Sequence, residues 1–136
     1  MAKKKNLRFK TIRQKVLIKA PVEAVFDALI DPKIQSEFTG AKATGKPTKG
    51  SEFTAWDGYI SGKYLSIKKE NKVAMTWLTS EWPDGYPPSK LILTFKDTEM
   101  GTWITLVQEK VPAEQANEYS QGWKDFYWQP MKEYFA

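Results

Sequence analysis

The sequence predicts an α+β fold in which a curved antiparallel sheet of about six strands wraps around one long C-terminal helix. Two observations lead to this expectation. Strand-like segments dominate the chain up to Pro112, and residues 119–135 carry large apolar side chains at steps of three and four, which places them on one helical face. An apolar helix face needs an apolar surface to pack against, and the sheet provides one. The expected face consists of Tyr119, Trp123, Phe126, Tyr127, Pro130, Met131 and Tyr134.

The composition limits the possible chemistry. With 136 residues, the chain fits one domain, expected over residues 8–136 after a disordered basic lead-in over residues 1–7. The sequence has neither histidine nor cysteine, which excludes disulfides, thiol nucleophiles, Cys/His zinc sites and His-dependent nucleophilic catalysis. We therefore expect no metal and no cofactor.

The charge and the apolar runs bear on location and partners. The net charge is +5, but the lysines are spread along the chain among acids and accompany no nucleic-acid-binding motif, so we expect no nucleic-acid partner. No apolar run has the length of a membrane span, and no apolar segment follows the basic start. We therefore expect neither membrane association nor a signal peptide, and a cytoplasmic location.

The first part of the chain predicts a strand and two short helices. Residues 9–18 alternate loosely between apolar and polar side chains, as a strand does. Pro21 suits the first position of a helix that continues to Ile30 with helical apolar spacing. Asp31-Pro32 ends that helix and caps a second one, in which Ile34 and Phe38 lie one turn apart.

The middle of the chain predicts hairpins. Asp57-Gly58 separates strand-like residues 53–56 from 59–67, and this dipeptide favours a type I′ turn because both central positions need positive φ. Residues 73–78 form the next expected strand. Residues 91–95 and 102–109 form a further hairpin.

Proline punctuates the remaining segments. Residues 81–89 contain Pro83, Pro87 and Pro88 and are expected to be a loop. Pro112 ends the sheet. Pro130 lies inside the terminal helix, where we expect a kink near Phe126 because proline lacks the backbone donor.

A series of short motifs then identifies a family resemblance. In order, these are Phe38-Thr39-Gly40-Ala41, Asp57-Gly58 with Gly62, Met75-Thr76-Trp77, Trp82-Pro83-Asp84-Gly85, Leu91 to Phe95, Gly101-Thr102, Val111-Pro112, and Gly122-Trp123 through Tyr127-Trp128-Gln129-Pro130. Together they resemble the C-terminal domain of the activators of the heat-shock protein 90 ATPase, within the START-like, helix-grip superfamily. The resemblance implies the helix-grip fold over nearly all the chain after Val16. It also implies a chaperone partner of the heat-shock protein 90 type, although the 136 residues do not include the separate N-terminal domain of the eukaryotic activator.

The first candidate site is a pocket between the sheet and the terminal helix. Ligand pockets are mostly apolar with a few polar groups, here expected from tyrosine hydroxyls. The alternative is that the same rings simply fill a close-packed core. The candidate ligand-binding residues are Tyr64, Met75, Trp77, Ile104, Leu106, Tyr119, Trp123, Phe126 and Tyr127.

The second candidate is a partner-binding surface. Trp82 and Tyr86 lie in the proline-rich loop and either anchor a partner or fold back as a lid. Trp128 lies nearly opposite Trp123 on an α-helical wheel, so we expect it to be partly exposed and to form a small docking or dimer patch with Phe135. The alternative is that the kink at Pro130 rotates Phe135 back under the sheet. Trp103 is expected on the outer face of the sheet, either as a cross-strand partner or as a contact residue, at a position where the family resemblance implies a polar residue.

No catalytic set emerges from the carboxylates, which occur mostly at turns and strand ends without a spacing typical of paired acid–base groups. We therefore expect a non-enzymatic module that binds a small hydrophobic molecule. The alternative is a regulator that docks on a heat-shock protein 90 chaperone and stimulates its ATPase. The oligomeric state is expected to be a monomer or a weak homodimer.

Overall fold

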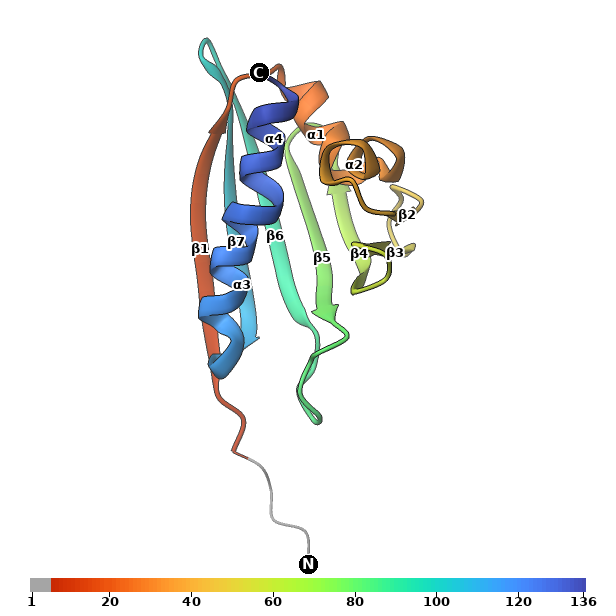
Figure 1. Ribbon diagram of the computed structural model, residues 1–136, viewed down its shortest axis with the longest axis vertical. Coiled ribbons are helices and arrows are strands. Elements are labelled where there is room, and N and C mark those ends of the chain that lie inside the picture. Colours follow the sequence, from red (N-terminus) through yellow and green to blue (C-terminus); the bar gives the residue numbers. More distant parts are fainter. Residues whose placement is uncertain (1–5) are drawn as a thin grey trace, which may run out of the picture.

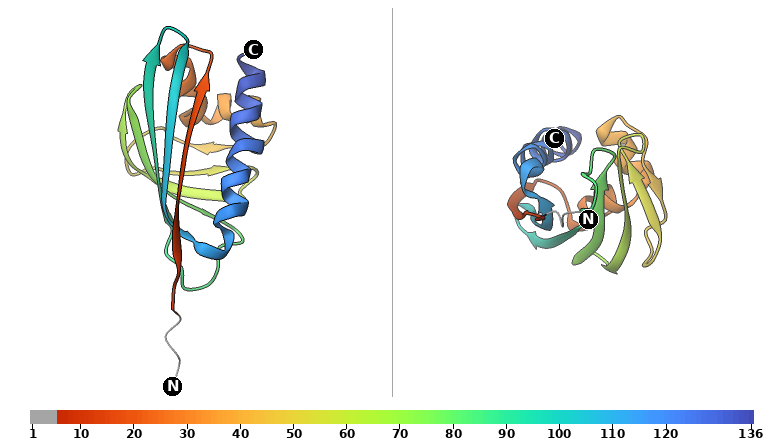
Figure 2. Two further views of the ribbon diagram at one scale, coloured as in Figure 1. Left: turned by 90° about the vertical axis from the view of Figure 1, so that its left-hand side faces the viewer. Right: turned by 90° about the horizontal axis from the view of Figure 1, so that it is seen from below.

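The structure is a computed structural model that describes residues 6–136. Most of the expected lead-in, residues 1–5, lies outside the described residues. The described chain contains a seven-stranded antiparallel sheet in the order β1-β7-β6-β5-β4-β3-β2. The sheet curls around the C-terminal helical segment (Figures 1 and 2), which confirms the expected α+β helix-grip arrangement.

The strands predicted from the sequence fall in the expected places, and several are longer at their ends; β2 is an additional short strand. Their bounds are β1 Phe9–Ile18, β2 Thr44–Gly45, β3 Glu52–Ala55, β4 Ile60–Lys68, β5 Lys72–Thr79, β6 Ser89–Thr98 and β7 Gly101–Pro112. The helices are α1 Val22–Ile30, α2 Pro32–Thr39, α3 Ala116–Trp123 and α4 Gln129–Tyr134, with a 3₁₀ turn η1 Ala113–Gln115 and a π-helical turn η2 Lys124–Trp128.

Two short helices cover one end of the sheet, and their junction follows local rules. The carboxylate of Asp31 accepts a hydrogen bond from the backbone nitrogen of Lys33 at 2.9 Å, so Asp31 caps α2 as expected. Gly40 ends α2 in the left-handed region at φ 76°, which glycine adopts without steric cost. Pro21 occupies the N-cap of α1, one position before the expected one.

The β3–β4 turn has the predicted chemistry. Asp57 and Gly58 have φ of 57° and 89°, and the nitrogen of Tyr59 donates to the carbonyl oxygen of Trp56 at 3.1 Å. Positive φ at both central positions is what a type I′ turn requires. Trp56 also has a positive φ of 53°, which costs a non-glycine residue roughly 1–3 kcal/mol.

The terminal helix differs from the expectation at one turn. Residues 124–128 form a π-helical turn, and Pro130 lies in the first turn of α4 directly after it. Proline has no N–H to bond the carbonyl four residues earlier, and a π turn accommodates that loss. The helical path from α3 to α4 continues without a sharp break (Figure 2), so a widened turn replaces the expected kink.

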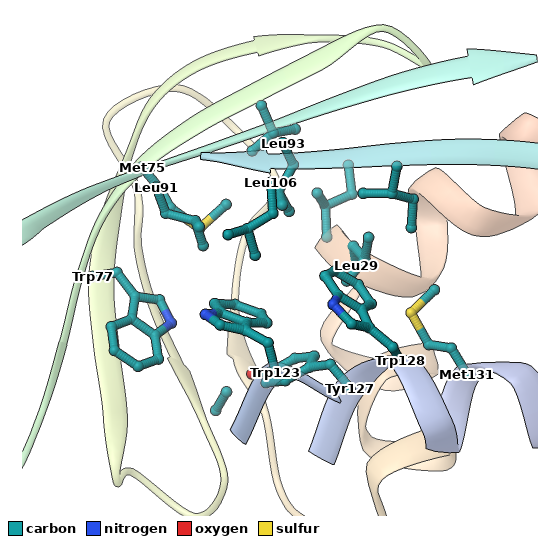
Figure 3. Packing of buried hydrophobic residues seen from close by; sticks show 14 of the residues in the cluster. Leu29, Met75, Trp77, Leu91, Leu93, Leu106, Trp123, Tyr127, Trp128 and Met131 are labelled. Carbon is teal, nitrogen blue, oxygen red and sulfur yellow. The ribbon is translucent and has the colours of Figure 1, made fainter. Parts of the chain in front are cut away.

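The π turn also overturns the expected exposure of Trp128. In an α-helix, residues five apart point about 140° away from each other, whereas a π turn joins residues five apart along the same side. Trp128 is therefore only 4% exposed and stacks on Trp123 at 5.6 Å between ring centroids. Figure 3 shows both rings pointing from the helix toward the strands. Phe126, expected on the inner face, is 53% exposed instead.

Candidate functional site

Three spaces adjoin the terminal helix in the part of the chain that the structure describes. One is a mainly polar hollow of about 460 Å³ between β1 and helical residues 124–132, and the other two differ greatly in size. The space inside the core, between the sheet, α1 and the rings of Trp123 and Tyr127, has a volume of about 30 Å³, which is room for little more than water. A second space beside the helix has a volume of about 330 Å³, within the range typical of ligand pockets. The interior between sheet and helix is thus packed. Among the spaces found in the described residues, the only mainly apolar one of ligand size lies beside the terminal helix.

We call this second space the aromatic pocket. It lies between the β3–β4 turn, β5 and the helical residues 118–127. Seven of its ten lining residues carry aromatic rings, so its wall is mostly apolar and rigid. The lining residues are Trp56, Tyr59, Ile60, Trp77, Glu118, Tyr119, Gly122, Trp123, Phe126 and Tyr127.

The rings of the pocket hold one another in place. Trp77 from β5 contacts Tyr119 at 5.4 Å and Trp123 at 5.7 Å between centroids. Across the pocket, Trp56 contacts Phe126 at 5.5 Å with the two planes at 72°. Such edge-to-face pairs are favourable beyond their buried area. The wall is therefore formed before any ligand arrives.

The proline-rich loop folds back onto this wall. Trp82 stacks on Tyr119 at 5.7 Å with an angle of 26° between planes, and its Nε1 donates to the carbonyl oxygen of Pro87 at 2.9 Å. Trp82 is half-buried. Of the two expected arrangements, its position is therefore that of a ring folded back as a lid. Tyr86 contacts Phe9 at 5.4 Å and accepts a hydrogen bond from the nitrogen of Arg8, which ties the loop tip to the start of β1.

Tyrosine hydroxyls supply most of the polar groups of the site. The hydroxyls of Tyr119 and Thr79 lie 2.7 Å apart, and Tyr119 donates to Oε1 of Gln115 at 3.1 Å. Burial raises the pKa of Tyr119 to about 12. Burial also raises the pKa of Tyr127 and, with the nearby Glu81 as a lesser cause, that of Tyr59. These three hydroxyls are neutral hydrogen-bonding groups at pH 7.

Trp56 brings an unsatisfied donor to the site. Its Nε1 is buried and makes no hydrogen bond of good geometry among the residues that the structure describes, although it lies close enough to the Tyr127 hydroxyl to lower the pKa of Tyr127 as a lesser cause beside burial. Buried polar atoms without partners are uncommon and call for an explanation. Together with the positive φ of Trp56, the unpaired donor marks the β3–β4 turn as the strained side of the pocket.

Two glutamines that the sequence reading missed fix the helix to the sheet. Oε1 of Gln108, which is fully buried on β7, accepts from Nε1 of Trp123 at 2.9 Å, and its Nε2 donates to Oγ of Ser89. Oε1 of Gln14 on β1 accepts from Nε1 of Trp128 at 2.7 Å. A signal existed, because both glutamines occupy inward positions of alternating strands and an inward polar side chain needs a partner.

The structure brings together only some of the predicted ligand-binding residues. Trp77, Tyr119, Trp123, Phe126 and Tyr127 line the aromatic pocket. Tyr64 and Met75 line the small interior space instead. Ile104 and Leu106 are fully buried core residues of β7 and border neither space.

The residues predicted to form a partner-binding surface lie in different environments. Trp128 is buried on the β1 side of the helix and is not an exposed contact, and Phe135 packs partly against the core. Trp103 lies opposite Leu17 in the β1–β7 ladder, and Nζ of Lys15 lies 4.8 Å from its ring centroid. This geometry is that of a cross-strand cation–π pair on the outer face.

Neither a metal-binding cluster nor a membrane-spanning helix is found among the described residues. Residues 6–136 contain no group of three or more His, Cys, Asp or Glu side chains placed to hold a metal ion. In the same range, every helix is too short or too polar to span a bilayer. The lining of the aromatic pocket supports apolar contact, aromatic stacking and hydrogen bonding.

Two curated relatives are similar to this chain in sequence. The human protein named activator of 90 kDa heat shock protein ATPase homolog 1 is 27% identical over 114 residues, which cover 84% of this chain and 33% of the human protein. The Dictyostelium discoideum protein of the corresponding name is 26% identical and is covered over 27% of its length. The chain thus spans about a third or less of the length of these relatives.

A solved structure shares the fold over almost its full length. The crystal structure of an HSP90 activator from Plasmodium falciparum superposes with a TM-score of 0.83 at 20% identity, covering 90% of this chain and 94% of the other. Residues 19–136 also match the family described as activator of Hsp90 ATPase homolog 1-like protein. That match covers most of the chain and includes the helices, β2 to β7 and every residue that lines the aromatic pocket. The chain belongs to the activator of Hsp90 ATPase homolog 1-like family.

Proposed function

We propose that this chain is a non-enzymatic cytoplasmic binding module that holds a small, largely apolar molecule in the aromatic pocket. The observation that carries the proposal is the contrast between a packed interior and a side pocket of about 330 Å³ walled by rings. A surface recess lined by so many aromatic side chains is costly to leave in water, and an apolar ligand removes that cost.

Several features support a ligand rather than a surface irregularity. The wall is braced by ring contacts, which lowers the entropy lost on binding. Tyr119 and Tyr59 offer neutral hydroxyls for orientation. Trp82 lies stacked on Tyr119 at the edge of the wall, where it shields one end of the site.

The experiment fills the pocket without dismantling the core. Gly122 lines the pocket, and a Cβ built on it meets only one ring carbon of Phe126, at 3.8 Å. Gly122→Leu therefore directs an apolar side chain into the space, and replacing a helical glycine also favours the helix. We expect at least a tenfold loss of affinity for the neutral fluorescent probe N-phenyl-1-naphthylamine, measured by titration, with no loss of stability.

The control variant is Gln121→Leu, which adds the same side chain at the neighbouring exposed position outside the pocket and should bind like the parent. Native mass spectrometry of protein purified from its own host should show a small-molecule adduct that Gly122→Leu lacks. Equal probe binding by the parent and Gly122→Leu, together with an absent adduct, would contradict the proposal.

A second candidate function is regulation of a heat-shock protein 90 chaperone. The family membership and the name of the human relative favour it. The docking surface would be the proline-rich loop with Trp82 and Tyr86, because Trp128 is buried. Adding the chain to the chaperone of its host should raise the rate of ATP hydrolysis.

Matched variants separate the two functions. Tyr86→Ala should reduce the stimulation of the chaperone, whereas Tyr134→Ala, at the other end of the molecule in α4, should not. Gly122→Leu should leave the stimulation intact if docking does not use the pocket. No stimulation at saturating protein would eliminate this second function and leave the first untouched.

A further inference from the structure

We infer that the ligand of the aromatic pocket is an amphiphilic cation, with an apolar body among the rings and a quaternary or protonated amine near Glu118. This inference rests on the proposed binding function and adds the chemical class of the ligand. It follows from the arrangement of the rings and from the charges around them.

The rings form the kind of enclosure that binds organic cations. Trp77 and Tyr119 meet at 81°, and Trp56 meets Phe126 at 72° and Tyr127 at 73°. Rings set nearly at right angles form corners and present aromatic surface to the space from more than one direction. The face of an aromatic ring carries partial negative charge, so several rings around one space stabilise a cation that has little hydration to lose.

The charge in the pocket lining is negative. Glu118 is the only ionisable group of formal charge that lines it, and neither lysine nor arginine does. This contrasts with a chain whose net charge is +5. A ligand with a carboxylate would meet the exposed Glu118 side chain without a compensating cation, whereas an ammonium group would be paired by it.

Carboxylates near the pocket contribute, as lesser causes beside burial, to the raised pKa values of two of its tyrosines. After burial, which is the largest cause, Glu81 contributes to the raised pKa of Tyr59. The pKa of Tyr119 is raised to about 12 mainly by burial, with Glu118 among the smaller causes. The effect of these carboxylates therefore extends to hydroxyls that line the pocket.

The test compares two probes of nearly the same shape, phenyltrimethylammonium and tert-butylbenzene, which differ by a positive nitrogen in place of a carbon. Binding to the full chain is followed by quenching of tryptophan fluorescence. We expect the cation to bind about tenfold more tightly than its neutral counterpart, in keeping with cation–π energies in partly desolvated sites. The preference should shrink as salt is added, because Glu118 is exposed.

Glu118→Gln should reduce the preference for the cation, measured as the ratio of the affinities for the two probes. Glu114→Gln makes the same change of charge at an exposed position of η1 that does not line the pocket, and it should retain the full preference. Circular dichroism of each variant verifies folding.

Each other outcome has a defined meaning. Equal binding of the two probes overturns the inference and leaves the binding function standing. An equal loss of preference in Glu114→Gln and Glu118→Gln also overturns it, because the effect would then come from overall charge. If neither probe binds, and the fluorescent naphthylamine also fails to bind, both the inference and the proposed function are wrong.

Discussion

Both sides of the terminal helix carry large aromatic side chains, but these rings are buried on one side and line an open pocket on the other. On the closed side, toward β1 and β7, the indoles of Trp123 and Trp128 are buried, and each donates a hydrogen bond to a glutamine. On the open side, toward the β3–β4 turn, the ring of Trp56 contacts those of Phe126 and Tyr127 beside a pocket of about 330 Å³.

The comparison shows that aromatic content alone does not decide whether a helix–sheet interface is solid. On the closed side, the strands supply side chains that match the indoles in both shape and hydrogen bonding. On the open side, the indole donor of Trp56 makes no hydrogen bond of good geometry among the described residues, and part of the wall is the β3–β4 turn in addition to strand residues. Polar complementarity across the interface is thus what distinguishes structural rings from rings that remain available for binding.

The largest expected effect is that of Trp123→Ala, which removes the ring shared by both sides. Trp123 is 4% exposed and stacks on Trp128, and its loss leaves a cavity and an unpaired Gln108 oxygen. Removing a buried aromatic side chain costs about 3–5 kcal/mol. Chemical unfolding with guanidinium should show this loss in the free energy of unfolding. A loss below that of the exposed Phe126 variant described below would contradict the comparison.

The next largest effects on the free energy of unfolding are expected for the two glutamines of the closed side, and they should differ in size. Gln108→Leu leaves Nε1 of Trp123 without an acceptor in the core and should cost about 1–3 kcal/mol. Gln14→Leu should cost less, because Gln14 is half-buried and water can reach its surroundings. The free energies of unfolding of the two variants, measured in urea, give the order directly. Equal losses would mean that burial does not set the value of these hydrogen bonds.

Alkaline pH should weaken the packed interior through Tyr64. Burial raises the pKa of Tyr64 from 10.0 to about 12 in the folded state, so the folded protein favours the neutral hydroxyl. The resulting stabilisation is fully present below pH 10 and is lost as the pH rises from 10 toward 12. The difference in unfolding midpoint between the parent and Tyr64→Phe, followed over this range, should narrow or change sign in favour of the variant. A pH-independent difference would show that Tyr64 ionises freely.

The smallest effect on stability is expected for Phe126→Ala on the open side. Phe126 is 53% exposed, and its main ring contact is with Trp56, so its loss should cost less than about 1 kcal/mol. The same change removes a wall of the aromatic pocket and should weaken binding of N-phenyl-1-naphthylamine several-fold. Thermal unfolding and probe titration on one preparation test both expectations. A large loss of stability with normal binding would reverse the roles assigned to the two sides.

Local sequence determined much of this molecule. The alternation of residues 9–18 gave β1 with the observed bounds, Asp31 capped α2, and Asp57-Gly58 formed the expected turn. These features depend on backbone preferences and on hydrogen bonds between near neighbours in the chain, so they can be predicted without knowledge of the remaining structure. The aromatic face of the terminal helix also predicted its contact with the sheet.

Tertiary structure decided which rings became buried and where the pocket lies. The π turn at residues 124–128 brought Trp128 under the sheet and left Phe126 outside, which an α-helical wheel does not anticipate. Gln14 and Gln108 meet their indole partners across sequence separations of 114 and 15 residues. Such matches, like the position of the pocket beside the helix, depend on the distance and orientation of distant segments, and periodicity along the chain carries no information about these.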